Sequence, residues 1–180
     1  MSQLKVNSLI PAGGLSAGSS GGIVQIRQTL KTDTFSSYSA TYIDVTGLSV
    51  SITPVSASNK ILVSVNMYGG VDQTEGSNRI FAWKVIRDST DFAIGDSAGL
   101  RRRATGGGIT YGFDGEVYSL TGSAIDSPAT TSSITYKVQV AVTADGGLGD
   151  PFIVNKMVTD DATTTYARMV SSITAMEISG

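Results

Sequence analysis

The sequence of 180 residues contains no cysteine and no histidine. Without cysteine the chain forms neither a disulfide framework nor a thiolate metal site. Without histidine it lacks the commonest general base and the commonest metal ligand, which excludes Ser-His-Asp and Cys-His nucleophilic sites. These absences favour a protein that is not an enzyme, has no catalytic residues and needs no cofactor or metal.

Charge and long apolar runs are also scarce. Charged residues make up 16% of the chain and the formal net charge is −2, so no global field attracts nucleic acid or an anionic membrane. No apolar run approaches the ~20 residues that cross a bilayer, and MSQLKVNSLIP lacks the apolar core of a signal peptide. We expect no nucleic-acid partner and no membrane insertion. Hydrophobic residues nevertheless make up 41%, which indicates a folded core.

The clearest pattern lies between Asp44 and Tyr68, where apolar and polar residues alternate on both sides of PVSASN. Alternate side chains of a strand point to opposite faces, so each arm presents one apolar face to a core. Because Pro54 cannot donate to a sheet ladder, the chain turns there, as a hairpin or as two strands joined across a sandwich. The residues expected to face the core are Leu48, Val50, Ile52, Ile61, Val63, Val65 and Met67.

The remaining chain predicts further short strands separated by turn signals, and no amphipathic helix. In residues 23–31, Val24, Ile26, Gln28 and Leu30 share one period-two face. Residues 80–86 are apolar on both faces, which is typical of a strand buried under a second sheet or against another subunit. Eight to ten such strands indicate an all-β, jelly-roll-like antiparallel β-sandwich. The other expected strands cover residues 42–45, 92–94, 111–120, 132–142, 152–159 and 170–178.

The first 22 residues differ from the rest. The glycine- and serine-rich stretch GGLSAGSSGG at 13–22 is typical of a flexible tether. It separates residues 23–180, the expected head domain, from Leu4, Val6, Leu9 and Ile10, which are too few to form a core. We therefore interpret residues 1–22 as a docking arm with its tether, and a disordered terminus is the alternative.

The candidate contact residues are three arginines in an expected loop and two aromatic residues at the start of the expected strand 111–120. Three adjacent cations, Arg101, Arg102 and Arg103, could pair with carboxylate or phosphate groups, although a solvated loop is the more ordinary interpretation. Tyr111 and Phe113, in the glycine-rich YGFDG, are the aromatic residues best placed to stack on a sugar.

The acidic residues do not favour a calcium site or a glycosidase site. Aspartates near 145–150 and 160–161 could supply oxygen ligands to Ca²⁺, but their spacing matches no calcium loop and turn formation explains them better. Asp114 and Glu116 form the one close carboxylate pair that resembles a glycosidase couple, yet neither lies in an obviously apolar stretch.

Several segments together resemble small tail-fibre or head-appendage proteins of tailed bacteriophages, cyanophages and other marine phages among them. The resemblance is one of strand and turn style over most of the chain and contains no catalytic signature. The segments are LKVNSLIPAGG, DVTGLSVSITP, SNKILVSV, WKVIRDST, AIGDSAG and SSITAMEISG.

The resemblance implies a virion protein, assembled in the host cytoplasm, whose arm docks on another tail or capsid protein. It also implies a homotrimer, the state usual in such appendages and also suggested by the two-faced strand 80–86. Two functions remain open: a tail-fibre subunit that binds a host surface glycan, or a capsid decoration (cement) or head-fibre protein with a purely structural role.

Overall fold

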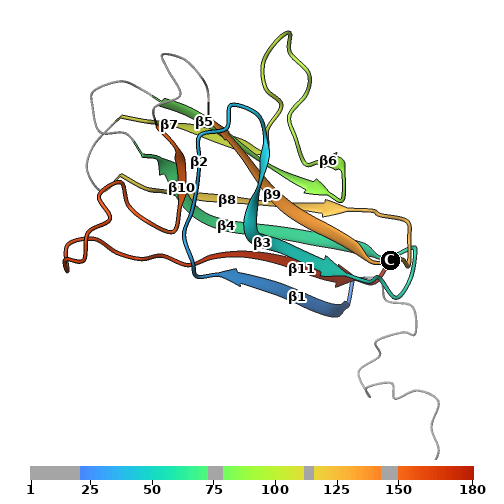
Figure 1. The fold of residues 1–180 in the computed structure, drawn as a ribbon. Coiled ribbons are helices and arrows are strands. Elements are labelled where there is room, and N and C mark those ends of the chain that lie inside the picture. Colours follow the sequence, from blue (N-terminus) through green and yellow to red (C-terminus); the bar gives the residue numbers. More distant parts are fainter. Residues whose placement is uncertain (1–20, 73–78, 112–115, 143–149) are drawn as a thin grey trace, which may run out of the picture.

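A computed structural model describes residues 21–72, 79–111, 116–142 and 150–180. The described residues form eleven strands and no helix, and every strand pairing is antiparallel (Figure 1). The prediction of an all-β antiparallel sandwich is confirmed. No described helix is long and apolar enough to cross a membrane.

The strands divide between two sheets, which we call sheet A and sheet B. Sheet A has the order β1-β11-β4-β10-β2, and β8 pairs with β4. Sheet B has the order β3-β9-β5-β6, and β7 also pairs with β5. The strands of sheet A are β1 (Ile23–Lys31), β2 (Phe35–Ser37), β4 (Lys60–Val71), β8 (Tyr118–Asp126), β10 (Phe152–Val154) and β11 (Ser171–Ile178). Those of sheet B are β3 (Ile43–Ile52), β5 (Arg79–Arg87), β6 (Thr90–Phe92), β7 (Gly106–Thr110) and β9 (Ile134–Val142).

The core lies between the two sheets and contains the residues that the alternation predicted. All seven apolar residues expected to face inward on β3 and β4 are buried. Strand β3 belongs to sheet B and β4 to sheet A, so the turn at Pro54 joins two strands across the sandwich and does not close a hairpin. Phe81 completes the core at the centre, with its ring centroid 5.2 Å from that of Phe152.

Strand β1 has the predicted bounds, but its apolar face points away from the core. Val24, Ile26 and Leu30 are exposed, whereas Lys31 on the alternate face is buried. The inward side of this edge strand is polar because it supports a buried carboxylate: Gln25 Nε2 donates a hydrogen bond to Glu177 Oε2 over 2.6 Å. Periodicity identified the strand correctly without identifying which face is buried.

Strand β5 is apolar on both faces, as predicted, and its own chain covers most of both. Trp83 lies in the core, while Ala82 and Ile86, on the outer face, are also buried. Because a single chain suffices to bury them, this strand gives no argument for a second subunit. Ile80, at the start of the strand, remains about half exposed.

Several strands were missed or misplaced, and the short β2 (Phe35–Ser37) was not expected at all. Residues 106–108 were expected in a loop because three glycines show no alternation, yet they form most of β7. A strand was expected over residues 111–120, but β8 covers Tyr118–Asp126 and residues 112–115 lie outside the described part. Strand β8 alternates small residues, Gly122 and Ala124, on its inner side, which gives a weak apolar signal.

The sandwich has two distinct ends. At one end, which we call the tether end, the backbone N–H groups of Gly21 and Gly22 donate to Ser179 Oγ over 3.1 and 3.0 Å. The ion pair between Arg87 Nη1 and Asp126 Oδ2, 2.7 Å long, joins the two sheets at the same end. The far end holds the other end of β5, where Arg79 Nε lies 2.6 Å from Asp150 Oδ2.

Candidate functional site

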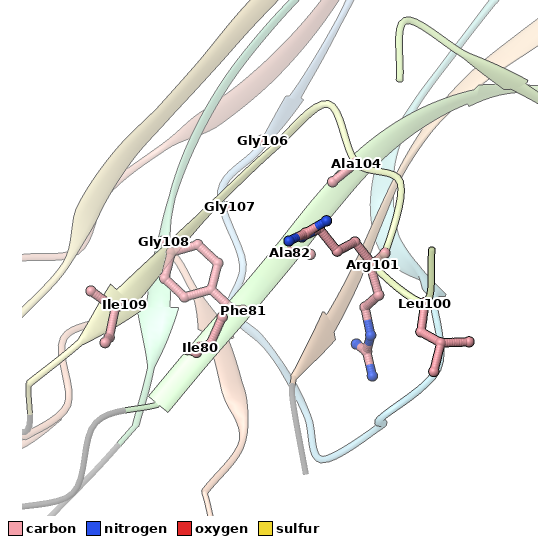
Figure 2. Close-up of a pocket in the computed structure, with 11 residues that line it drawn as sticks. Ile80, Phe81, Ala82, Leu100, Arg101, Ala104, Gly106, Gly107, Gly108 and Ile109 are labelled. Atoms are coloured by element: carbon pink, nitrogen blue, oxygen red, sulfur yellow. The ribbon is translucent and has the colours of Figure 1, made fainter. Parts of the chain in front are cut away.

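A shallow groove of about 690 Å³ lies on the outer side of sheet B (Figure 2). Its floor is formed by Ile80 and Ala82 of β5 and by Gly107 and Ile109 of β7. Residues 93–105, which we call the arginine loop, connect β6 to β7 and form the opposite wall. Figure 2 shows Ile80, Phe81 and Ile109 at one end of the groove, with Leu100 and Arg101 at the other. The groove is therefore apolar along its floor and cationic at one rim.

The glycines of β7 shape this floor. A Cβ at Gly108 would lie 2.7 Å from Phe81 Cζ, and a Cβ at Gly106 would lie 2.6 Å from Trp83 Nε1. Real Cβ atoms do not approach so closely, so glycine lets β7 lie directly against two core aromatic rings. The glycine run that carried no strand signal therefore allows β7 to pack close to the core beneath the groove.

The three adjacent arginines have different roles. Arg102 Nη1 donates to Val142 O over 3.2 Å, and Arg103 Nε donates to Gly95 O over 2.8 Å. Both side chains hold the arginine loop against sheet B. The Arg101 side chain is exposed and has no partner among the described residues, so its guanidinium is the one available to a ligand.

The arginine loop is anchored further by Tyr42, whose hydroxyl donates to Arg103 O over 3.0 Å. Lys84 Nζ lies 4.6 Å from the centroid of the Tyr42 ring, a cation–π contact. Partial burial raises the pKa of the Tyr42 hydroxyl, against an opposing effect of the Arg102 charge. Tyr42 is therefore a neutral hydrogen-bond donor at neutral pH, and the loop is held by several independent contacts.

The candidate aromatic residues do not form a platform in the groove. Tyr111 is exposed just after β7 and does not line the groove, and Phe113 lies outside the described residues. The Tyr111 N–H donates to Glu116 Oε2 over 2.9 Å, and the Tyr118 hydroxyl donates to the other carboxylate oxygen. Burial and the Glu116 charge raise the pKa of Tyr118 to about 12. Glu116 thus orders the local chain, and Asp114, its proposed partner, is not described.

Asp145 lies outside the described residues, and the other candidate aspartates make internal contacts. Asp150 pairs with Arg79, and Asp160 Oδ2 lies 2.9 Å from Arg168 Nη2. Asp161 accepts a hydrogen bond from the Thr163 hydroxyl over 2.7 Å. Within the described ranges no group of three acidic residues is placed to hold a metal ion. The docking-arm residues Leu4, Val6, Leu9 and Ile10 lie outside the described part.

Sequence reasoning found the arginines but missed the apolar groove beside them. Leu100 is fully exposed next to Arg101. Ile80 is 47% exposed, although the sequence predicts that its strand is buried on both faces. The available signal was Leu100 itself, a large apolar residue between a glycine and three cations in an expected loop. No local pattern reveals that β7 brings Ile109 beside Ile80; that pairing is a long-range register.

Comparison with known proteins finds structural likenesses but no sequence match. No family model and no curated protein matches the sequence. Over 97% of its length the chain is similar to a chain in the structure of infectious bursal disease virus Gx strain, with 14% sequence identity and a TM-score of 0.44. The chain spans 46%, or about half, of that viral chain. At this identity the likeness does not extend to function.

Proposed function

We propose that this protein is a structural protein of a bacteriophage virion, a tail-fibre subunit that contacts the host surface through the groove of the arginine loop. The single observation that carries this proposal is the separation of two features on one sandwich. The chain enters at the tether end, where Gly21 is hydrogen-bonded to Ser179. The groove begins at Ile80 and Ile109, in the half of sheet B toward the far end. Anchoring by residues 1–22 would thus leave the start of the groove on the half of the sandwich that lies farther from the virion.

The chemistry of the groove suits an anionic saccharide. Arg101 offers a planar guanidinium that binds carboxylate or phosphate through two parallel hydrogen bonds. Ile80, Leu100 and Ile109 offer apolar surface to the C–H face of a sugar ring. An open groove with one free cation provides weak binding per site, so several copies would act together on a cell surface.

Adsorption of an Arg101→Ser variant tests this function. Loss of a charge-assisted hydrogen bond costs about 1.5–3 kcal/mol, so we expect binding to host cells to weaken by roughly tenfold or more. The variant should keep its melting temperature, because the Arg101 side chain makes no hydrogen bond or ion pair with a described residue, and its backbone hydrogen bond to Ala98 is kept. Arg27→Ser, which removes one exposed charge from β1, is the matched control and should adsorb normally. Equal adsorption of both variants would refute a receptor role for the groove.

One observation favours the alternative of a capsid decoration or head-fibre protein. Two of the three arginines donate hydrogen bonds to backbone carbonyls that hold the arginine loop in place, which reduces the number of cations available to a receptor. The number of copies per virion separates the two functions. A handful of copies supports the tail fibre, and dozens or hundreds support the capsid role.

A further inference from the structure

One apolar row crosses four strands on the outer face of sheet A. Ile26 on β1 pairs in register with Met176 on β11, Met176 pairs with Leu62 on β4, and Leu62 pairs with Ile125 on β8. Ile26 is 50% exposed and Ile125 is 58% exposed, so the row lies open on the single chain. The row runs from one edge strand to the other. Packing of the core does not explain this apolar row, since all four side chains point away from the core.

The same face carries almost no charge. Among the outward positions of β1, β4, β8 and β11, all of them described, Lys60 alone is charged. The next row along the strands consists of Gln28, Thr174, Ser64 and Ser123. The outer side of sheet B differs: it carries ion pairs between Lys137 and Asp44 and between Lys84 and Asp91. Depletion of charge around exposed large apolar residues distinguishes the centre of a protein interface from ordinary surface.

We infer that the outer face of sheet A is the surface through which copies of this chain associate. An uncharged face of apolar, hydroxyl and amide side chains is complementary to itself, which an isologous contact between two copies requires. This inference concerns assembly and does not depend on what the groove of the arginine loop binds.

The size of the face fits a second copy of the chain. Four strands ~4.8 Å apart and about nine residues of ~3.3 Å each give a face of roughly 570 Å². Two such faces together exceed the roughly 1,000 Å² that a specific interface buries. The chain's own arm is the other conceivable occupant, but an extended segment of ~12 residues has the width of a single strand and would leave most of the row open.

Charge insertion into the row tests the inference on the full-length protein. Ile26→Glu and Ile125→Glu each place a carboxylate in the row, and Ile80→Glu places one at a similarly exposed position on sheet B. We expect light scattering at micromolar concentration to give an oligomer for the wild type and for Ile80→Glu. The two sheet A variants should be folded by circular dichroism, and their association should weaken at least ~30-fold because a charge is buried without a partner. A monomeric wild type, or sheet A variants that assemble normally, would overturn the inference.

Thiol labelling tests whether a second copy covers this face even if the glutamate variants do not fold. The natural chain has no cysteine, so Ile125→Cys and Ile80→Cys each carry one thiol. At concentrations where the protein is assembled, a charged maleimide should label Ile125→Cys at least ~10-fold more slowly than Ile80→Cys, and dilution should equalise the rates. Equal rates in the assembled protein would show that this face is free. Protection of Ile125→Cys in a monomer would show that the arm covers it, which also contradicts a second copy.

Discussion

Single polar residues connect segments that are far apart in the sequence. Asn155, directly after β10, is fully buried and has a φ of 61°, in the left-handed region that asparagine tolerates. Its Nδ2 donates to Lys31 O over 2.7 Å and to Asp33 O over 3.0 Å. Its Oδ1 accepts from Ser171 Oγ over 2.6 Å. One amide therefore joins the end of β1 to the start of β11 and the end of β10.

Removal of that amide should be costly. Asn155→Ala removes the amide donor from the carbonyls of Lys31 and Asp33 and the acceptor from the Ser171 hydroxyl, and it places alanine at a positive φ. We expect the free energy of unfolding to fall by about 3–5 kcal/mol, measured by urea denaturation. Asn66→Ala, at an exposed position on β4, should cost less than about 0.5 kcal/mol. A loss below about 1 kcal/mol for Asn155→Ala would mean that water replaces the network.

Glu177 gives a pH-dependent contribution to stability. Burial raises the pKa of this carboxyl, but hydrogen bonds from Gln25, Asn59 and the Val55 N–H outweigh burial and hold the pKa below its usual 4.5. The folded state thus favours the carboxylate, and the stabilisation is present above the unfolded pKa. It is lost as the pH falls through the lower, folded pKa.

The matched comparison is with Glu177→Gln, whose side chain does not titrate. We expect the wild type to be the more stable protein at pH 7, and the difference in free energy of unfolding to shrink steadily as the pH is lowered from 5 to 3. Urea denaturation at several pH values measures it. A difference that does not change with pH would show that the Glu177 charge contributes nothing.

At the scale of strands, β7 is the element that the local sequence pattern predicts least well. Gly108→Ala places a Cβ 2.7 Å from Phe81 Cζ, and the Phe81 ring is fixed by contacts with Tyr118 and Phe152. We expect a loss of about 1–3 kcal/mol in stability, because β7 or the ring must move. Gly95→Ala is the control, since its nearest neighbour lies 3.9 Å away. A melting temperature equal to that of the control would show that β7 adjusts freely.

The contrast between strands explains what the sequence could reveal. Alternation identified the inward faces of β3, β4 and β9 because large apolar residues alternate with mostly polar residues along these strands. It failed for β7, where glycine has no side chain to alternate. For β1 it found the strand but not the buried face, because the inward side binds the Glu177 carboxylate. The separate roles of Arg101 and Arg102 depend on tertiary contacts, which no local pattern contains.

At the scale of the whole molecule, the two outer faces of the sandwich differ in charge and shape, and its two ends differ in where the chain enters. Sheet B carries charges and the groove of the arginine loop, and sheet A carries the uncharged face with its apolar row. The tether begins at the end where Arg87 and Asp126 join the sheets. Under the two proposals above, anchoring, self-association and surface contact would fall on separate parts of one sandwich, so we expect that each can be removed without the others.

Deletion of residues 1–20 isolates the anchoring step. The truncated chain keeps Gly21 and Gly22, whose N–H groups bind Ser179, and it keeps the whole core. We therefore expect a melting temperature within about 2 °C of the wild type and an unchanged number of chains per oligomer, since the apolar row lies entirely within residues 23–178.

The same truncation should abolish incorporation into virions, because Leu4, Val6, Leu9 and Ile10 are then missing. These four side chains gain about 1.5–3 kcal/mol each when a partner surface buries them, which must offset the lost freedom of the arm. The control replaces the four residues with serine at full length and should also fail to incorporate. A truncated protein that unfolds or dissociates would place the arm in the core or the oligomer interface, and normal incorporation would show that docking uses another surface.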